Sequence, residues 1–365
     1  MTGRPTTVGL PSIPRLAADR FGLGTLTGPP TKLGPNYSNA IWRVDTTRGR
    51  FAVKCLLGVL DVAALEAAVG FEQAAVHAGF PAAAPESTPA DELLVPVDVG
   101  GRDGFVRAHR WVDGAVLGEG PGHGSVRSAD AAAAGGYLAR LHHLGAEHAS
   151  ASGAPARCSS GIATRPIHWA RYRPHAGRSG PLAVLDDDAF ALLESLPPPA
   201  AAAAECFCHA DFKPENAVRA GAGLVVLDWD QACRADPAVE LAIAALRWAC
   251  VSGGALHEPR FRAFLRGYRK DGGPVSALTQ RHFAASARLS AEWIDFNARQ
   301  ALGELPGVVL DAASNIAATL AAIRAGLDAL PDWAALAAEA LACRSARTAP
   351  DGDAVPGPDQ TARPC

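Results

Sequence analysis

The sequence predicts a helix-rich α+β fold with two lobes, in which a small antiparallel sheet precedes a larger and mostly helical part. A chain of 365 residues is long enough for one large two-lobed domain or for two modest domains. Short runs of β-branched and aromatic residues gather before residue 112, whereas apolar residues recur at helical spacing over most of the chain beyond about residue 181. The many alanines favour helix over strand, and a hydrophobic content of 48% with 19% charged residues is typical of a globular protein.

The predicted sheet lobe covers residues 29–112. Before it, residues 1–28 contain proline and glycine without clear periodicity, so we expect a loosely ordered lead-in. The runs NAIWRVDT and RFAVKCLL, separated by the turn-prone TRG, predict an antiparallel hairpin. Helical spacing then predicts one helix that ends at Gly79 and Pro81, and ELLVPVDV and GFVRAHRWV predict two further strands.

The predicted helical lobe covers residues 113–345. The glycine-rich stretch DGAVLGEGPGHGS marks a flexible connection between the lobes, and AAAAGGYLARLHHLG predicts the first helix after it. A strand, a loop and a hairpin interrupt the helices before residue 230. Residues 346–365 are rich in proline, glycine and polar side chains, so we expect a disordered tail.

Charge and hydropathy argue against several classes of protein. A formal net charge of −3 leaves no basic footprint for nucleic acid and no attraction to an anionic membrane. The first residues lack a continuous apolar core of signal-peptide length, and no stretch reaches the roughly eighteen apolar residues that cross a bilayer. We therefore expect a cytoplasmic monomer or weak dimer without nucleic-acid or membrane partners.

The stretch CHADFKPENAVRAGAGLVVLDWD, residues 208–230, places polar side chains between two apolar strands. His209, Asp211 and Asn216 form the pattern H-x-D-x-x-x-x-N, and Asp228 follows the apolar run LVVL. Asn216 and Asp228 are thus expected at the ends of adjacent strands, where their oxygens can hold a hard cation such as Mg²⁺. Asp211 remains available to orient a hydroxyl and accept its proton. This division of labour suits phosphoryl transfer, in which the protein positions the nucleophile and neutralises charge.

Phosphoryl transfer also needs a cation for the phosphates, and Lys54 is the candidate. It lies inside RFAVKCLL with Ala52 and Leu56 on the same strand face, an unfavourable place for a charge unless an anion meets it. Taken alone, Lys54 could be an edge-strand lysine that prevents aggregation, and Asp211 and Asn216 could be turn formers. The order of these residues along the chain favours the functional interpretation.

FAVK, HADFKPEN and LDWD together resemble the lysine, catalytic loop and metal-binding segment of the aminoglycoside phosphotransferase family. The resemblance extends over roughly residues 30 to 340 and includes FVRAHRWVDG, LARLH and ADPAVELA in the same order. It implies a bilobal protein-kinase-like fold. It also implies ATP- and Mg²⁺-dependent phosphorylation of a hydroxyl on a small molecule.

The resemblance implies a role for each motif residue. Asp211 would be the catalytic base, Asn216 and Asp228 the Mg²⁺ ligands, and Lys54 the partner of the α and β phosphates. His209 would stabilise the loop.

The resemblance also implies where the nucleotide would be held. Backbone from Ala108 to Trp111, a segment that includes His109, would hold the adenine edge. The turn LGPNYSNA would cover the phosphates, but it has one glycine where a protein kinase has three, so the side chains of Ser38 or Asn39 are expected to supply donors.

Three acidic side chains have roles that the resemblance leaves open or assigns to structure. The helix glutamate that pairs with Lys54 has two candidates, Glu66 and Glu72, and GFEQAAVHAGFP matches the family's pattern better at Glu72. Asp230 is expected at the surface beside Trp229.

The acceptor molecule is the least defined part of the prediction. Glu292 and Asp295 lie on one face of a predicted late helix and are candidate contacts for a cationic substrate, although a solvated helix face is the competing interpretation. The weakly charged end of the chain departs from the aminoglycoside enzymes, so an amino alcohol, homoserine, a sugar or a macrolide are alternative acceptors. A catalytically silent nucleotide-binding pseudokinase is the second alternative.

Overall fold

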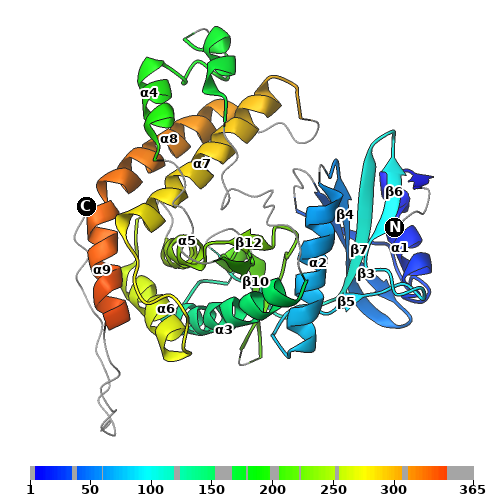
Figure 1. Ribbon diagram of the computed structural model, residues 1–365. Coiled ribbons are helices and arrows are strands. Elements are labelled where there is room, and N and C mark those ends of the chain that lie inside the picture. The colour runs from blue at the N-terminus through cyan, green and yellow to red at the C-terminus, as the bar shows by residue number, and fades with distance from the viewer. Residues whose placement is uncertain are drawn as a thin grey trace, which may run out of the picture.

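The computed structural model describes residues 5–34, 39–59, 61–118, 124–152, 167–177, 180–197, 205–221, 223–250, 255–305 and 311–342. Figure 1 shows two lobes: a sheet with few helices at the N-terminal end of the chain and a larger helical lobe beside it. The α+β class and this two-lobed arrangement agree with the prediction from sequence. In the part of the chain that the structure describes, no helix combines the length and the apolar character needed to cross a membrane.

The N-terminal lobe is built on a sheet with the strand order β1-β6-β7-β4-β3-β2, and β5 also pairs with β7. Its centre is antiparallel, because β4 pairs with β3 on one side and with β7 on the other. In the second of these pairs Lys54 stands directly opposite Arg107. The strands are β1 (Thr6–Val8), β2 (Thr31–Leu33), β3 (Asn39–Thr46), β4 (Gly49–Leu57), β5 (Pro85–Glu86), β6 (Val95–Val99) and β7 (Asp103–Arg110).

The helix α2 (Val62–His77) lies between this sheet and the large lobe (Figure 1). Its N-terminus is capped by the side chain of Asp61, which accepts a hydrogen bond from Ala64 N at 3.0 Å. One face packs Leu65 with the sheet residue Leu56. Another face places Phe71 against Phe207 of the large lobe, so α2 contacts both lobes.

The prediction of a loosely ordered lead-in over residues 1–28 is wrong for the residues that the structure describes. Strand β1 extends the sheet as a parallel neighbour of β6, and α1 (Ile13–Arg20) follows a short 3₁₀ turn, η1 (Leu10–Ser12). Ile13 and Ala17 of α1 are fully buried in the core of the sheet lobe. Eight residues give only a weak helical pattern in the sequence. The helix is stabilised by the burial of these apolar side chains.

The large lobe combines helices with two small sheets. Its helices are α3 (Ser128–Ser152), α4 (Asp187–Ser195), α5 (Pro237–Ala249), α6 (Glu258–Lys270), α7 (Gln280–Ala301), α8 (Ala312–Asp328) and α9 (Leu330–Ala342), with the 3₁₀ segments η3 (Trp169–His175) and η4 (Pro214–Asn216). Its strands are β8 (Ala115–Val116), β9 (Cys206–Cys208), β10 (Ala217–Ala220), β11 (Gly223–Val226) and β12 (Cys233–Ala235). The sheets are β11-β10-β8 and β12-β9.

The two largest apolar cores among the described residues of this lobe are formed by different helices. The main core joins α3, α5 and α6 with the strands β9, β10 and β11. A second core joins η3 and α4 to α7 and α8. In the main core α3 approaches α6 closely at Gly135, where a Cβ atom would lie 1.9 Å from the carbonyl oxygen of Phe264. The predicted tail, residues 346–365, lies outside the described residues.

Candidate active site

A cavity of about 270 Å³ lies between the lobes and brings together most of the residues predicted for the site. Its walls come from β3, β4, α2 and β7 on one side, and from η4, β10 and residues 227–230 on the other. Residues predicted from sequence that line it are Lys54, Glu72, His109, Trp111, Asn216 and Asp228.

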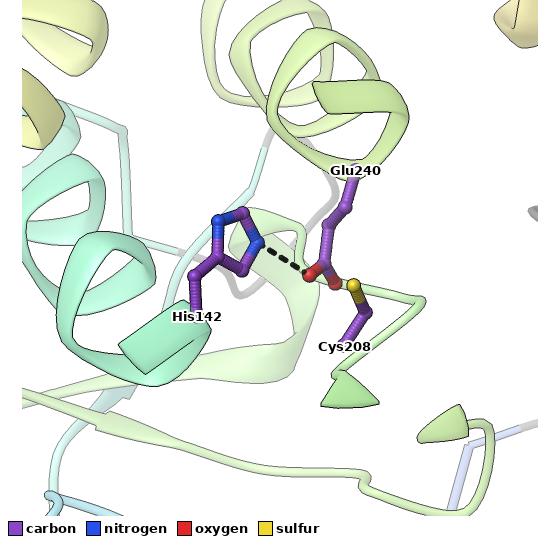
Figure 2. Close-up of side chains that lie close together, drawn as sticks. All are labelled: His142, Cys208 and Glu240. Carbon is purple, nitrogen blue, oxygen red and sulfur yellow. Dashed lines mark hydrogen bonds and ion pairs between the residues drawn. The ribbon is translucent and has the colours of Figure 1, made fainter. Parts of the chain in front are cut away.

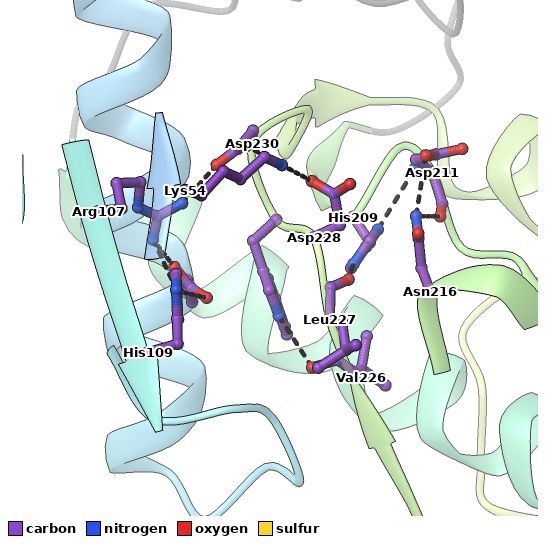
Figure 3. A network of polar contacts seen from close by, with 12 residues as sticks. Lys54, Arg107, His109, His209, Asp211, Asn216, Val226, Leu227, Asp228 and Asp230 are labelled. Atoms are coloured by element: carbon purple, nitrogen blue, oxygen red, sulfur yellow. Dashed lines mark hydrogen bonds and ion pairs between the residues drawn. The ribbon is translucent and has the colours of Figure 1, made fainter. Parts of the chain in front are cut away.

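Lys54 reaches from β4 across the cavity to the large lobe. Its Nζ lies 2.6 Å from Asp228 Oδ1 and 2.5 Å from Asp230 Oδ2 (Figure 3). Burial opposes the charge on this ammonium group, but the two carboxylates more than compensate and raise the pKa of Lys54. The two lobes are therefore joined by charge at this point.

The expected partner of Lys54 on α2 requires a correction. Glu72 is buried at the site while Glu66 is exposed, so Glu72 is the better of the two candidates. Within the part of the chain that the structure describes, however, Glu72 pairs with Arg107 and His109 rather than with Lys54.

The strand register explains this exchange of partners. Arg107 stands opposite Lys54 on β7, so a second cation reaches the α2 carboxylate. The distance from His109 Nε2 to Glu72 Oε1 is 3.0 Å. Burial raises the pKa of Glu72, but Arg107 and His109 outweigh it and lower that pKa to about 2.

Asp230 and Arg107 are functional-site residues that the sequence interpretation missed. Asp230 was expected at the surface, yet its side chain is only 8% exposed and accepts contacts from Lys54 and from Arg107 Nη1, the latter at 2.5 Å. Arg107 could have been found from the sequence, because it is a charged residue within a predicted strand. Such a charge requires an anion nearby, as argued for Lys54. Asp230 carried a weaker signal, because an aspartate after a short apolar run is often exposed.

The loop that carries Asp211 is held by His209. His209 Nε2 lies 2.9 Å from the carbonyl oxygen of Leu227, to which it donates, and its Nδ1 accepts a hydrogen bond from Asp211 N at 3.3 Å (Figure 3). The imidazole also packs 5.0 Å from the Trp229 ring, centroid to centroid. This histidine therefore connects the loop to the end of β11.

The Asp211 carboxylate faces two donors. Lys213 Nζ lies 2.7 Å from its Oδ2, and Asn216 Nδ2 donates to the same oxygen at 2.9 Å. Burial raises the pKa of Asp211, but Lys213, followed by His209 and Asn216, lowers it overall. Asp211 is therefore ionised near neutral pH and able to accept a proton.

The strand register brings Asn216 and Asp228 to the same cavity. Ala217 of β10 pairs with Val226 of β11, and Leu227 N donates to the Asn216 carbonyl oxygen at 2.8 Å. Since Asn216 donates through Nδ2, its amide oxygen is the atom left for a cation. Asp228 has a left-handed φ of 61° and a side chain 38% exposed, which presents its carboxylate to the cavity.

A second buried group of side chains, His142, Glu240 and Tyr268, holds the loop from behind; we call it the loop anchor. Glu240 of α5 accepts the backbone N–H of Ala210 at 2.6 Å, and Ala210 has a left-handed φ of 65°. The other Glu240 oxygen accepts from His142 Nε2 at 2.9 Å (Figure 2), and the Tyr268 hydroxyl lies 2.7 Å from His142 Nδ1. The anchor stabilises a backbone conformation that alanine rarely adopts.

The loop anchor fits hydrogen bonding better than metal binding. Cys208 lies beside His142 and Glu240, with ligand atoms within 4.8 Å of one another (Figure 2). Burial, Cys206 and Glu240 raise the pKa of the Cys208 thiol, which opposes the thiolate form that a metal requires. Three candidate ligands also fall short of the four that structural zinc uses.

In the segment predicted to hold the adenine edge, Ala108 to Trp111, two backbone N–H groups are already hydrogen-bonded within the protein. The N–H of Arg110 donates to Ala84 O at 2.9 Å and that of Trp111 donates to Arg50 O at 3.0 Å, so neither is available to a base. Val112 and Gly114 line the same cavity just beyond them. The expectation that backbone from Ala108 to Trp111 holds the adenine edge therefore finds no free N–H group at Arg110 or Trp111.

The predicted phosphate turn is only partly described. Ser38 lies outside the described residues. Asn39 begins β3 opposite Leu56, and Ile41, two residues further along the strand, lines the cavity.

Helix α7, which carries the candidate acceptor residues Glu292 and Asp295, approaches Asp211 at its Leu289. A small cavity beside Asp211 is lined by Lys213, Arg247 and Leu289, the last from α7. Further along α7, Asp295 accepts a hydrogen bond from the Tyr172 hydroxyl at 2.6 Å. Glu292 is half-buried on the same helix.

Comparison with known protein families agrees with the geometry of the site. The model of the phosphotransferase enzyme family matches residues 31–273, which is most of the chain. The two-lobed fold with a cavity between the lobes is that of a phosphotransferase, and the chain belongs to the phosphotransferase enzyme family. None of the curated proteins compared matches the chain.

Solved structures share the fold at low sequence identity. An amicoumacin kinase in complex with AMP-PNP, Ca²⁺ and Ami has a TM-score of 0.60 at 14% identity, covering 85% of this chain and 93% of that one. A choline kinase from Cryptosporidium parvum has a TM-score of 0.55 at 11% identity, covering 88% and 96%. A macrolide 2′-phosphotransferase from Brachybacterium faecium has a TM-score of 0.52 at 18% identity, covering 85% and 98%. The predicted protein-kinase-like fold is therefore confirmed.

Proposed function

We propose that this protein transfers the γ-phosphoryl group of ATP to a hydroxyl of a small molecule, with Mg²⁺ as the metal. The observation that carries the proposal is the meeting of Lys54 with Asp228 at 2.6 Å inside the cavity between the lobes, beside Asn216. These side chains come from positions far apart in the sequence and include the cation and the oxygen ligands that phosphoryl transfer requires. The similar fold of an amicoumacin kinase solved with AMP-PNP and Ca²⁺ supports a nucleotide and a divalent cation.

The residues present fit a hard divalent cation. Asp228 offers a carboxylate, and Asn216 offers its amide oxygen because its nitrogen already donates to Asp211. Oxygen ligands of this kind suit Mg²⁺, which keeps several of its waters. When bound, the metal would neutralise charge on the phosphates.

On this chain's side of the reaction, Lys54 binds the phosphates and Asp211 handles the acceptor. The ionised Asp211 carboxylate accepts the proton of the acceptor hydroxyl, whose oxygen forms a bond to the γ-phosphorus. The bond from that phosphorus to the β–γ bridging oxygen breaks, and ADP leaves with the electron pair. Lys213, 2.7 Å from Asp211 Oδ2, keeps the carboxylate ionised and oriented.

A panel of hydroxylated metabolites and antibiotics, incubated with the enzyme, Mg²⁺ and ATP, tests the proposal. The panel includes amino alcohols, homoserine, sugars, aminoglycosides and macrolides, and mass spectrometry detects the gain of one phosphate. We expect at least one acceptor to be phosphorylated. Slow ATP hydrolysis without acceptor would separate an active enzyme with an untested substrate from a catalytically silent protein.

The matched variant for this test is Asp211→Asn, which keeps the shape of the side chain. It should bind nucleotide as the wild type does and lower kcat by about a hundredfold or more, because the amide cannot accept the proton. Nucleotide binding is measured by thermal shift. A kcat equal to that of the wild type would exclude Asp211 as the base.

A further inference from the structure

Four buried side chains form an alternating chain of charges at the back of the cavity; we call Lys54, Asp230, Arg107 and Glu72 the charged cluster. Lys54 contacts Asp230, Asp230 contacts Arg107, and Arg107 contacts Glu72. Each of these side chains is at most 10% exposed. Buried charges are stable when each has a partner of opposite sign, and the alternation provides one at every step.

The charged cluster is balanced without Asp228. It contains two cations and two anions, so the ion pair between Lys54 and Asp228 is additional to a neutral set. Asp228 is also the most exposed of the carboxylates involved, at 38%. It can turn to a metal without leaving Lys54 buried and unpaired, because Asp230 stays in place.

Asp230 is held more firmly than its neighbour Asp228. Trp229, between the two aspartates, is buried and packs its ring 5.7 Å from both Phe71 and Phe80, centroid to centroid. Arg107, which holds the Oδ1 of Asp230, is itself fixed in the β4–β7 register. The Asp230 carboxylate therefore has one orientation, with its second oxygen toward Lys54.

We propose that Asp230 is the residue that positions Lys54 for the phosphates, and that Arg107 joins Asp230 to Glu72 on α2. The inference rests on the proposed function, because it assigns Lys54 to the nucleotide. Glu72 acts on Lys54 only through Arg107 and Asp230. The position of α2 is thereby coupled to the lysine through three side chains rather than one ion pair.

Two isosteric amide variants separate the roles of the carboxylates. Asp230→Asn should lower kcat by roughly 30-fold, because Lys54 loses its fixed partner, whereas Glu72→Gln should lower kcat by less than about fivefold. Both are measured at saturating ATP and acceptor, on protein shown to be folded by thermal denaturation. A loss from Glu72→Gln equal to or larger than that from Asp230→Asn would overturn the proposal, since it would mean that Glu72 pairs with Lys54 during turnover.

A double-mutant cycle tests whether Asp230 acts through Lys54. In the Lys54→Met background, Asp230→Asn should change the residual kcat by no more than about twofold, because the side chain that it positions is gone. A loss of roughly 30-fold in both backgrounds would overturn the proposal and would indicate a direct role, such as metal ligation, especially with a higher Mg²⁺ requirement.

If Asp230→Asn does not fold, a charge-balanced variant tests the same proposal. Asp230→Asn with Arg107→Met removes one anion and one cation, so that Lys54 and Glu72 remain as one cation and one anion. It should show the same loss of kcat, and a wild-type kcat in this variant would overturn the proposal. Wild-type enzyme without any phosphoryl transfer would instead contradict the proposed function itself.

Discussion

The two buried polar networks of this protein differ in how completely their groups are satisfied. In the loop anchor, the Tyr268 hydroxyl accepts from Val275 N and bonds His142, whose other nitrogen bonds Glu240. In the charged cluster, among the described residues, Arg107 Nε is buried without a hydrogen-bond partner. Lys54 there also shares its charge between two carboxylates.

The loop anchor is therefore a fixed support, whereas the charged cluster adjoins a contact that can be exchanged. Any change in a fully satisfied buried network costs free energy, so the loop anchor holds Ala210 and Asp211 in one geometry. The charged cluster adjoins a cavity and contains one ion pair, from Lys54 to Asp228, that a ligand can replace. Rigidity on one side of the site and exchange of partners on the other suit the proposed binding of a nucleotide.

The largest expected effect concerns the ion pair between Lys54 and Asp228. Asp228→Ala should lower phosphotransfer by about a thousandfold or more, because the proposed metal ligand is lost at the point where charge develops. The melting temperature should stay close to that of the wild type, because Asp230 still pairs with Lys54. Asp45→Ala is the control: Asp45 is an aspartate of similar exposure on β3, paired with Arg43, and its loss should leave the rate unchanged.

The second prediction tests the loop anchor. His142→Ala should lower the free energy of unfolding by about 3 kcal/mol, because it leaves Glu240 and the Tyr268 hydroxyl buried without their partner. Urea denaturation measures the change. His143→Ala removes the neighbouring, exposed histidine and should leave the urea midpoint unchanged; equal losses in both variants would contradict the assignment.

The third prediction concerns pH and the charged cluster. The pKa of Glu72 in the folded protein is lowered to about 2, below its ordinary value of 4.5. The ionised carboxylate therefore stabilises the fold above about pH 4.5, and this contribution is lost as the pH falls toward 2. Glu72→Gln should cost ~2–3 kcal/mol at pH 6 and less at pH 3.5, by urea denaturation at each pH. A cost that is the same at both pH values would show that the lost contribution is not ionic.

The smallest expected effect comes from removing the exposed cation of an ion pair. Asp130 is bound by both Arg127 and Arg219, and the Arg127 side chain is 60% exposed. Arg127→Ala should leave the urea midpoint unchanged, because Arg219 still neutralises Asp130 and exposed pairs contribute little. A clear loss would show that burial does not decide which of these networks stabilise the protein.

The sequence predicted the contiguous motifs better than the contacts between them. Lys54, Asp211, Asn216 and Asp228 were identified because each lies in a short pattern with a chemical reason. The partner of Glu72 could not be read in this way, since it depends on the register that sets Lys54 opposite Arg107. Register is fixed by pairing along whole strands, and no local pattern encodes it.

The fold was predictable where local signals were strong. The hairpin of β3 and β4 and the helix α2 follow from alternation, turn residues and the stop at Gly79. The short helix α1 was missed because eight residues give little periodicity, and its stability comes from packing on the sheet.

The crossing between the lobes is tied down at both ends. Trp111 is hydrogen-bonded to Arg50 in the sheet lobe, while at Gly114, which has a φ of 153°, a Cβ atom would lie 2.2 Å from the Arg219 carbonyl oxygen on β10. Only Val112 and Asp113 stand between these two attachments. The connection between the lobes is therefore short and closely packed, and a larger side chain at position 114 would push it away from β10, the strand that begins beside Asn216.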